Sequence, residues 1–403
     1  MDLRLDYRGY KAIDLFAGAG GFSLAAKNMG VELLAAVELN TDACATYQQN
    51  IIKRRSQETK LYSHDILKIS PETLLTDLSL EPGELDLLMG GPPCQGFSTH
   101  RIKNSGIDDP RNSLLIRYFD FVKTLKPKTF LVENVPGLLW KRHELYLQKF
   151  KNLSKKNGYT LFGPIKINAK DFGVPQNRER VFILGLRTDQ VSNDLNLEWP
   201  PKATHFPPEL GGVSWKTAST VFEPAPKEIF IQLAAKLGKD LVSNLTFGER
   251  IPSLEEDPTA IHMTHSEQLV ARFEKTPING SRSDIDFRLP CHSNGYRGHL
   301  DVYGRIRLAQ PGPTITTGCF NPSKGRFLHP WKNHGITVRH AARFQTFPDD
   351  FVFSGGITSQ GAQVGNAVPI KLGEVMVNTA LKCIAQSKKS TDFLESNLKE
   401  HLA

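Results

Sequence analysis

Asp14-Leu-Phe-Ala-Gly-Ala-Gly-Gly-Phe-Ser23 is the stretch of sequence that decides the fold of this chain. It begins inside the apolar run Lys11–Phe16, which predicts a buried strand, and it leads into Phe22–Met29, which predicts a helix that stops at Gly30. Three glycines permit a tight turn and the close approach of a ligand to the backbone: Gly18, Gly20 and Gly21. A strand, a glycine turn and a helix in this order predict a ligand site at the end of the strand.

The same alternation of short apolar runs and helical patterns continues to about residue 190. Strands are predicted at Leu33–Val37, Leu85–Met89, Thr129–Val132 and Val181–Leu186, and helices at Thr41–Ile52 (with Thr41 as its cap), Asn112–Leu125 and Lys141–Asn157. Strands that alternate with helices predict an α/β fold with a parallel sheet that is covered on both faces. Such sheets bind ligands at the carboxyl ends of their strands.

The alternation of apolar runs and helical patterns ends after Leu186. Six prolines fall between Trp199 and Pro226, and they disfavour regular elements there. A helical pattern with Thr337 as its N-cap follows later, and a last long helix is predicted at Val368–Ala385. We therefore expect a catalytic domain at 1–190, an irregular inserted domain at 191–334, and a segment at 335–403 that returns to the first domain.

Composition and charge restrict the cellular setting and the partner. The 403 residues include no run of eighteen apolar residues, and the N-terminus lacks the apolar region of a signal peptide. Five scattered cysteines form neither a disulfide framework nor a paired zinc pattern, and the spacing of His262, His265, Cys291 and His292 fits no standard metal site. These features predict a cytoplasmic protein without a membrane span or a metal. The net charge of +8 suggests a polyanionic partner.

The glycine turn departs from the dinucleotide-binding pattern G-x-G-x-x-G. Its third glycine would fall at position 23, where this chain has Ser23. Glu38 ends the second predicted strand, where an acid can accept hydrogen bonds from ribose hydroxyls. A nucleoside cofactor without a pyrophosphate fits both observations, and Asp65 is a weaker candidate for the adenine amino group. A glycine turn with solvated acids is the alternative.

Gly90-Gly-Pro-Pro-Cys-Gln-Gly-Phe-Ser98 follows directly after the predicted strand Leu85–Met89. Two prolines make the loop before Cys94 rigid, so that its thiol can be held at a fixed distance from a bound substrate. A free cysteine has a pKa of about 8.5 and needs nearby positive charge to ionise. The alternative is a small buried apolar residue, which the polar Gln95 and Ser98 make a poor explanation.

Glu133-Asn-Val and Gln176-Asn-Arg-Glu-Arg180 flank two further predicted strands. Glu133 ends one strand, and Arg178 and Arg180 would share a face if the second segment is extended. Each motif alone is compatible with a surface ion-pair network. With Cys94 they form a set of nucleophile, acid and anion-stabilising cations.

These motifs, together with Arg343-Phe-Gln-Thr-Phe-Pro-Asp349 and Gly365-Asn-Ala-Val-Pro369, resemble in identity and order those of the DNA cytosine-5 methyltransferase family of bacterial and phage modification enzymes. The resemblance spans residues 12 to 369. It implies a Rossmann-like S-adenosylmethionine-dependent methyltransferase fold with an inserted irregular target-recognition domain. It also implies transfer of the methyl group of S-adenosyl-L-methionine to C5 of a flipped cytosine in a specific duplex DNA sequence.

The resemblance implies catalytic roles for residues of three motifs. Cys94 would attack C6 of the cytosine, and Glu133 would contact N3 and the exocyclic amine. Arg180, with Arg178 beside it, would hold the carbonyl oxygen of the base. Gln95 and Ser98 would belong to the loop that closes over that base.

The resemblance also implies a set of cofactor contacts. Phe16 would stack on the adenine, Glu38 would bind the ribose, and Asn366 would complete the pocket from the C-terminal segment. The remaining cofactor-binding residues would be Gly18, Gly20, Gly21, Leu39, Asp65, Ile66, Pro92 and Leu114. Leu39 stands where the family often has an aromatic residue, which would weaken one adenine contact.

The inserted region is expected to read the DNA. Between Asn279 and Lys332 there are eight basic residues and three acidic ones, a difference of five positive charges. We expect Arg305, Arg307 and Arg326 to contact phosphates or base edges. A solvated basic loop is the alternative.

Three other functions compete with this interpretation. A transfer-RNA cytosine-5 methyltransferase shares the fold and carries Cys-Phe-Thr where this chain has Cys319-Phe-Asn. A catalytically inactive relative and a dehydrogenase fit less well, because Cys94, Glu133 and Arg180 are intact and the glycine pattern departs. We expect a monomer that acts on duplex DNA in the cytoplasm of a bacterium or phage-infected cell. A cognate restriction endonuclease would be linked to it genetically rather than physically.

Overall fold

The computed structural model describes residues 6–54, 58–93, 113–191, 197–285 and 301–401, and it divides into two compact units. The first unit comprises residues 1–167, 179–202 and 370–403, and the second comprises residues 168–178 and 203–369. The first unit therefore includes less of the chain than the sequence analysis assigned to the catalytic domain and its returning segment. Residues 168–178 and 335–369 group with the insert in the second unit.

A seven-stranded sheet forms the centre of the first unit. Its order is β3-β2-β1-β4-β5-β7-β6, so the numbering falls from β3 to β1 and then rises from β4. β1, β2, β3, β4 and β5 run parallel, whereas β7 is antiparallel to β5. The strands span Lys11–Leu15 (β1), Glu32–Glu38 (β2), Lys60–Ser63 (β3), Leu87–Gly90 (β4), Thr129–Asn134 (β5), Tyr159–Asn168 (β6) and Glu179–Arg187 (β7).

The sheet is thus mixed, and the expectation of a wholly parallel sheet was wrong for β7. A short apolar run predicts a buried strand, but its composition does not reveal the direction in which the strand enters the sheet. The sequence analysis also missed β6, because Gly163-Pro164 interrupts its apolar pattern. β6 lies at the edge of the sheet, where a proline removes no hydrogen bond that the sheet needs.

Helices cover the two faces of this sheet. α11 packs against α1 and β5, and α4 packs against α3 and α5. Phe130 of β5 is the centre of the aromatic core, with ring centroids 5.2 Å from Tyr159 and 6.0 Å from Phe150. The helices of this unit span Gly21–Asn28 (α1), Thr41–Tyr47 (α2), Pro71–Leu78 (α3), Ser113–Leu125 (α4), Glu144–Lys156 (α5) and Ile370–His401 (α11).

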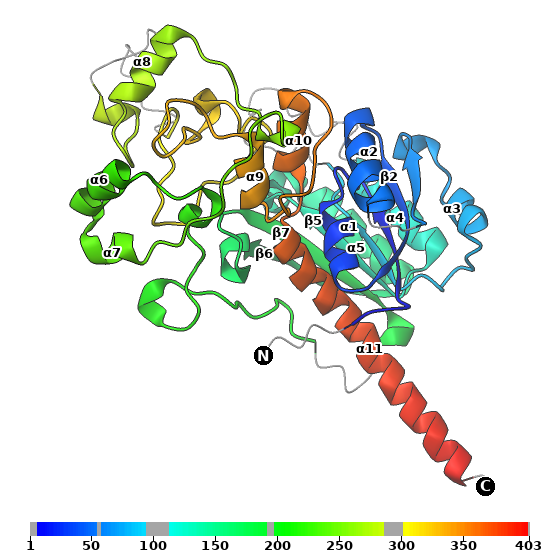
Figure 1. Ribbon diagram of the computed structural model, residues 1–403. Coiled ribbons are helices and arrows are strands. Elements are labelled where there is room, and N and C mark those ends of the chain that lie inside the picture. The colour runs from blue at the N-terminus through cyan, green and yellow to red at the C-terminus, as the bar shows by residue number, and fades with distance from the viewer. Residues whose placement is uncertain (1–5, 55–57, 94–112, 192–196, 286–300, 402–403) are drawn as a thin grey trace. The chain divides into compact units, whose positions relative to one another are not determined.

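The predicted helices of the first unit are confirmed with shifted ends. The predicted helix at Thr41–Ile52 is α2 followed by a π-helix at Gln48–Lys53, and its N-cap is Asn40 rather than Thr41. The Asn40 side chain accepts a hydrogen bond from the Ala43 amide at 2.9 Å, as an N-cap residue does. α11 is longer than predicted and runs beyond the sheet (red in Figure 1). In the described part of the chain, no helix combines the length and the apolar character that crossing a membrane requires.

The second unit is built mainly from short helices and irregular chain. Its α-helices span Lys227–Leu237 (α6), Lys239–Ser243 (α7), Glu267–Lys275 (α8), Val338–Phe344 (α9) and Ile357–Asn366 (α10). Thr337 caps α9 as predicted, because its side chain accepts a hydrogen bond from the His340 amide. Among the described residues, β-pairing in this unit is limited to isolated bridges such as Arg305 with Leu328. Much of its buried backbone must therefore be satisfied by side chains.

Candidate active site

The glycine turn after β1 has an unusual backbone. Phe16 has a φ of 60°, which is uncommon for a residue other than glycine, and Gly18 and Gly20 have φ values of 56° and 95°. The Ala17 amide donates to the carbonyl of Val37 in β2 at 3.0 Å, which fixes the start of the turn. Strained positions of this kind are concentrated at functional sites. This turn follows the carboxyl end of β1, where the strand order reverses, and ligands of such sheets bind at points of this kind.

Glu38 links the end of β2 to this turn. One carboxylate oxygen accepts from the Gly18 amide at 2.8 Å and the other accepts from the Asn40 amide at 2.7 Å. Each oxygen keeps lone-pair capacity, so the oriented carboxylate can still accept from ligand hydroxyls. Leu39 follows with 64% of its surface exposed. An oriented acid and an exposed apolar side chain therefore lie side by side at the carboxyl end of β2.

Asp65 and Ile66 follow β3 as expected for the adenine-side residues. Asp65 caps the 3-10 helix Ile66–Lys68 by accepting from the Leu67 amide at 3.0 Å, and Ile66 is buried. Arg117 of α4 donates to the Ile66 carbonyl at 3.1 Å and therefore holds this turn in place. The sequence analysis missed Arg117, because its position in the amphipathic helix α4 gives no signal. Leu114, in the first turn of α4, packs against the same core as Ile66.

Glu133 and Arg180 form an ion pair at the junction of β5 and β7. Arg180 Nε lies 2.8 Å from Glu133 Oε1, and only 12% and 10% of the two side chains are exposed. Antiparallel pairing creates this contact, because Glu133 is opposite Phe182 in the register. Burial lowers the pKa of Arg180, and the neighbouring Glu133 carboxylate opposes that shift. The structure thus brings together two of the expected catalytic residues.

Asn134 connects this pair to the segment that leads to the expected nucleophile. Its side-chain amide donates to the Pro92 carbonyl at 3.2 Å, and its side-chain oxygen accepts from the Val135 amide at 2.8 Å. A Cβ at Gly91 would lie 3.2 Å from Glu133 Oε2, so Gly91 permits the segment to approach the carboxylate. Cys94, Gln95 and Ser98 lie outside the described residues. The role of Asn134 was not predicted, although its place in the Glu-Asn-Val motif was a signal.

Arg178 does not accompany Arg180, and this part of the prediction was wrong. Its side chain is fully buried in the second unit, where the guanidinium donates to the carbonyls of Ile315, Gly365 and Ala367 at 2.8 to 3.0 Å. The alternation argument failed because Arg178 precedes β7, so the segment is not extended throughout. Arg178 therefore joins chain segments of the second unit. Asn366, the last residue of α10, also belongs to that unit, and its cofactor role stays a prediction.

Two of the three arginines expected to contact DNA are structural. Only 3% of Arg305 is exposed, and its guanidinium donates to the carbonyls of Thr276, Phe273, His329 and Lys332 and to the Asn333 side chain. Arg326 is 8% exposed and bonds to Asp301 and to two carbonyls. Because the fully engaged guanidinium of Arg305 has no donor left for a phosphate, its predicted DNA contact is wrong. The bonds of Arg326 use Nε and Nη1, and its DNA contact stays a prediction. Arg307 is exposed, and its DNA contact also stays a prediction.

In the second unit, the polar side-chain atoms of three residues lie close together: Glu223, His329 and His340. His329 Nδ1 accepts from the Lys332 amide at 3.1 Å, and His340 Nδ1 accepts from the Thr337 amide at 3.2 Å. Neutral rings with these acceptors carry their proton on Nε2, which faces Glu223 at 3.5 Å from His329 and 3.3 Å from His340. A metal would need those same Nε2 atoms deprotonated. The arrangement suits a buried hydrogen-bonded hub better than a metal site.

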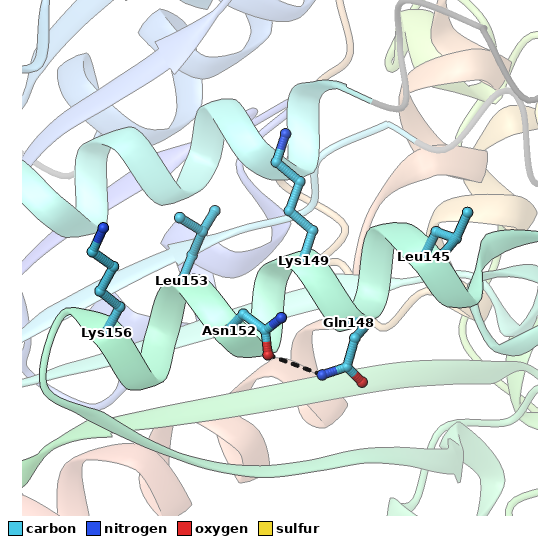
Figure 2. A pocket seen from close by; sticks show the side chains of 6 residues that line it. All are labelled: Leu145, Gln148, Lys149, Asn152, Leu153 and Lys156. Atoms are coloured by element: carbon cyan, nitrogen blue, oxygen red, sulfur yellow. Dashed lines mark hydrogen bonds between the residues drawn. The ribbon is translucent and has the colours of Figure 1, made fainter.

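The groove drawn in Figure 2 lies elsewhere in the first unit. It follows one face of α5, where Gln148 donates to Asn152 at 2.9 Å and where Leu145 and Lys149 are exposed. Ligand sites usually combine an apolar cavity with convergent polar groups. This face is an open helix surface without such a set among its lining residues, and we do not assign a substrate to it.

Comparison with known proteins agrees with the fold and the motifs. Residues 10–382 match the model of the C-5 cytosine-specific DNA methylase family. The Type II methyltransferase M.DdeI of Desulfomicrobium norvegicum is 31% identical over 90% of this chain and 86% of its own length. The Type II methyltransferase M1.HphI of Haemophilus parahaemolyticus is also 31% identical, over 92% of this chain and 86% of its own length.

Solved structures agree on the fold. A prophage-encoded E. coli protein assigned as a DNA modification methyltransferase has a TM-score of 0.64 at 22% identity, covering 94% of this chain and 100% of that protein. The Entamoeba histolytica methyltransferase EhMeth has a TM-score of 0.56 at 16% identity, covering 93% of this chain and 98% of that protein.

The sheet order and the site at its switch point define a Rossmann-like S-adenosylmethionine-dependent methyltransferase, as predicted. The chain belongs to the C-5 cytosine-specific DNA methylase family. It is an enzyme that transfers the methyl group of S-adenosylmethionine to C5 of cytosine in DNA.

Proposed function

We propose that this enzyme methylates a cytosine that is flipped out of a specific duplex DNA sequence, through a covalent bond between Cys94 and C6 of the base. The observation that carries the proposal is the buried Glu133–Arg180 ion pair, 2.8 Å between Nε and Oε1. The backbone of Gly91 and Pro92, three and two residues before Cys94, is held beside this pair through Asn134. Nucleophile, acid and cation can therefore act on one bound base.

The residues around the glycine turn fit S-adenosylmethionine. Glu38 is an oriented acid that suits a ribose diol, and a Cβ at Gly18 would meet no atom within 4 Å, so the turn is open to a ligand there. Phe16, Leu39 and Ile66 provide apolar surface for an adenine. S-adenosylmethionine supplies a methyl group that is electrophilic because it is attached to a sulfonium. We assign its remaining contacts to Gly20, Gly21, Asp65, Pro92, Leu114 and Asn366.

Cys94 makes C5 of the cytosine reactive. Its thiolate forms a bond to C6, which breaks the aromaticity of the ring and turns C5 into an enamine carbon that can take the methyl group. Loss of the C5 proton to solvent and expulsion of the thiolate then restore the ring and free Cys94. The base must leave the duplex first, which costs a few kcal/mol of unstacking.

Glu133 and Arg180 prepare the base for this addition. A carboxyl that contacts N3 and the exocyclic amine stabilises the extra electron density on the ring, and Arg180 holds the carbonyl oxygen next to it. The ion pair keeps Arg180 pointing at Glu133 before the base arrives. Preorganised charge of this kind is more effective in a buried site than in water.

Duplex DNA is the substrate we assign, in the setting of a restriction–modification system. The curated relatives named above are Type II methyltransferases, which supports that setting. A cognate endonuclease would be linked genetically, and we propose that the enzyme acts as a monomer in the cytoplasm. Transfer RNA is a poorer substrate candidate. Cys319, in the Cys-Phe-Asn segment, is fully buried, and burial raises its pKa to about 12, so it is not a reactive thiol.

Exchange of the nucleophile tests the proposal. Cys94→Ser should abolish methyl transfer to duplex DNA while S-adenosylmethionine still binds, because a serine hydroxyl is a far weaker nucleophile than a thiolate. Radiolabelled methyl transfer to duplex DNA and to transfer RNA, with calorimetric cofactor binding, measures both properties. Substantial methylation by the variant would reject the covalent route, and a preference for transfer RNA would reject the substrate.

A further inference from the structure

A buried chain of three side chains runs beneath the glycine turn. The Tyr47 hydroxyl donates to Ser23 Oγ at 2.8 Å, and Ser23 Oγ donates to Asp14 Oδ2 at 2.6 Å. Asp14 is 1% exposed, and Ser23 and Tyr47 are completely buried. Because an ionised carboxylate can only accept hydrogen bonds, the direction of both bonds is fixed from Tyr47 toward Asp14. The chain joins α2 and α1 to β1.

The position of this chain connects it to the turn that we assign to the cofactor. A Cβ at Gly20 would lie 3.1 Å from Tyr47 Cδ2 and 3.0 Å from Ile51 Cγ1, so Tyr47 packs directly against the turn. Ser23 is the third residue of α1 and occupies the place of the third glycine in dinucleotide-binding sites. That glycine allows the helix to pack closely on the strand. Here a hydrogen bond from Ser23 to Asp14 joins the helix to the strand instead.

The carboxyl of Asp14 lies next to the first turn of α1, where Ser23 contacts it. Its carboxyl also accepts from the backbone amide of Ser23. In dinucleotide-binding folds the N-terminus of this helix attracts a pyrophosphate. An ionised Asp14 would offset that attraction and would favour positive charge in its place.

We propose that Asp14, held by Ser23 and Tyr47, selects the charge of the cofactor. Asp14 favours S-adenosylmethionine, whose sulfonium is cationic, over its neutral thioether product S-adenosylhomocysteine and over phosphate-bearing nucleotides. It acts through the turn and is a positioning residue rather than a catalytic one. The inference rests on the proposed cofactor site.

The ionisation of Asp14 makes this selection measurable. Burial raises the pKa of Asp14 to about 7, the two hydrogen bonds from Ser23 lower it, and the charge of Glu38 raises it. The other titratable groups that face it are Tyr47 from α2 and Tyr118 from α4. Burial raises the pKa of both tyrosines, so they stay neutral near pH 7.

A bound cation favours the ionised form of Asp14, so cofactor binding should lower its pKa. Binding near pH 7 should then release protons, and affinity should increase as the pH rises. The gain reaches about tenfold for each unit by which binding lowers the pKa. The neutral product should show a smaller gain. The amino group of the ligand also titrates, and the sulfonium lowers its pKa in the cofactor relative to the product. The part of the pH dependence that Asp14→Asn removes is therefore the part assigned to Asp14.

Calorimetric titration of the full-length protein with both ligands tests the inference. The titrations run between about pH 6 and pH 8.5, in two buffers of different ionisation enthalpy, which gives the number of protons released. The wild-type protein should prefer the cofactor over the product more strongly at the higher pH. Asp14→Asn should lose this pH dependence, and ADP should compete more effectively for the variant. An unchanged preference with unchanged proton release would overturn the inference.

Two further variants keep the test decisive. Ser23→Ala removes a hydrogen bond that lowers the pKa of Asp14, so the pH at which protons are released should move upward. If Asp14→Asn does not fold, an unmoved midpoint in Ser23→Ala rejects the inference by itself. Glu38→Ala separates the two claims. Unchanged cofactor affinity in Glu38→Ala rejects the proposed site, whereas weakened affinity together with an ineffective Asp14→Asn rejects only the role of Asp14.

Discussion

Arg180 of the first unit and Arg178 and Arg305 of the second unit bind different kinds of partner. In the first unit Arg180 meets the carboxylate of Glu133 at the end of a strand. In the second unit Arg178 and Arg305 are more deeply buried, and they donate mainly to backbone carbonyls. In the first unit the paired strands satisfy most carbonyls around Arg180, and its Nε pairs with Glu133, whereas Arg117 of α4, outside the sheet, donates to the carbonyls of Ile66 and Ile69. The irregular chain of the second unit needs donors from side chains.

This difference explains why one part of the sequence was easier to interpret than another. A motif at the end of a predicted strand is expected to lie at one edge of the sheet, and Glu133 and Arg180 are in contact there. A high count of basic residues in an irregular region has two competing explanations, phosphate contact and internal cross-linking. Arg305 and Arg326 are cross-links, whereas Arg307 is exposed.

The largest effect is expected at the Glu133–Arg180 pair. Glu133→Gln keeps an oxygen that can accept from Arg180, so the fold should persist, but it removes the carboxyl that acts on the base. We expect the rate of methyl transfer in single-turnover experiments to fall by about 10²- to 10⁴-fold. Circular dichroism and cofactor affinity serve as controls. A rate close to that of the wild-type protein would show that the pair is structural, like the arginines of the second unit.

Loss of Arg305 should affect stability instead. Arg305→Ala leaves several buried carbonyls without a donor, which should lower the free energy of unfolding by about 3 kcal/mol or more. Arg307→Ala is the matched control, because an exposed arginine two residues away should change stability by less than about 0.5 kcal/mol. Urea unfolding of both variants measures the difference. Equal stabilities would mean that Arg305 is not the cross-link we describe.

The hub around Glu223 should make the second unit sensitive to acid. Burial lowers the pKa of His334 to about 4, and it also lowers the pKa values of His329 and His340. Below the unfolded-state value of about 6.5, the unfolded chain therefore binds more protons than the folded one. Stability should fall as the pH falls, by about 1.4 kcal/mol per pH unit for each such histidine until its folded pKa is reached.

Urea unfolding at about pH 7.5 and pH 5.5 checks this dependence. The Glu223 carboxylate acts in the same sense but only at lower pH: burial raises its pKa, but the contacts with His329, His340 and Lys332 outweigh burial and lower it below the usual value. His334→Gln should reduce the pH dependence. A second unit that is equally stable at both pH values would contradict the neutral state of these rings.

The smallest effect is expected from Arg307. If it contacts one phosphate, Arg307→Ala should weaken DNA binding modestly and reduce the slope of log K against log salt by about 0.9. Fluorescence anisotropy at several salt concentrations measures the slope, and unchanged cofactor affinity is the control. An unaltered slope would reject the DNA contact predicted for Arg307.

The sequence was sufficient for the fold class and for the placement of the main motifs. The runs at Lys11–Phe16 and Thr129–Val132 are strands, and their motifs lie at the carboxyl edge of the sheet, because strand and helix periods are local properties. The antiparallel entry of β7 was not predictable, since it depends on long-range pairing. Glu223 and His329 are separated by 106 positions in the sequence (329 − 223), so no local sequence pattern predicts that they lie close together.

The most direct test of the account is covalent trapping on duplex DNA that contains 5-fluorocytosine at the target position. Fluorine at C5 prevents the proton loss that releases the thiolate, so the enzyme should stay bonded to the DNA in the presence of S-adenosylmethionine. On a denaturing gel we expect a stable protein–DNA adduct for the wild-type enzyme and for Arg307→Ala, and none for Cys94→Ser. An adduct with Cys94→Ser, or none with an active wild-type enzyme, would contradict the covalent role of Cys94.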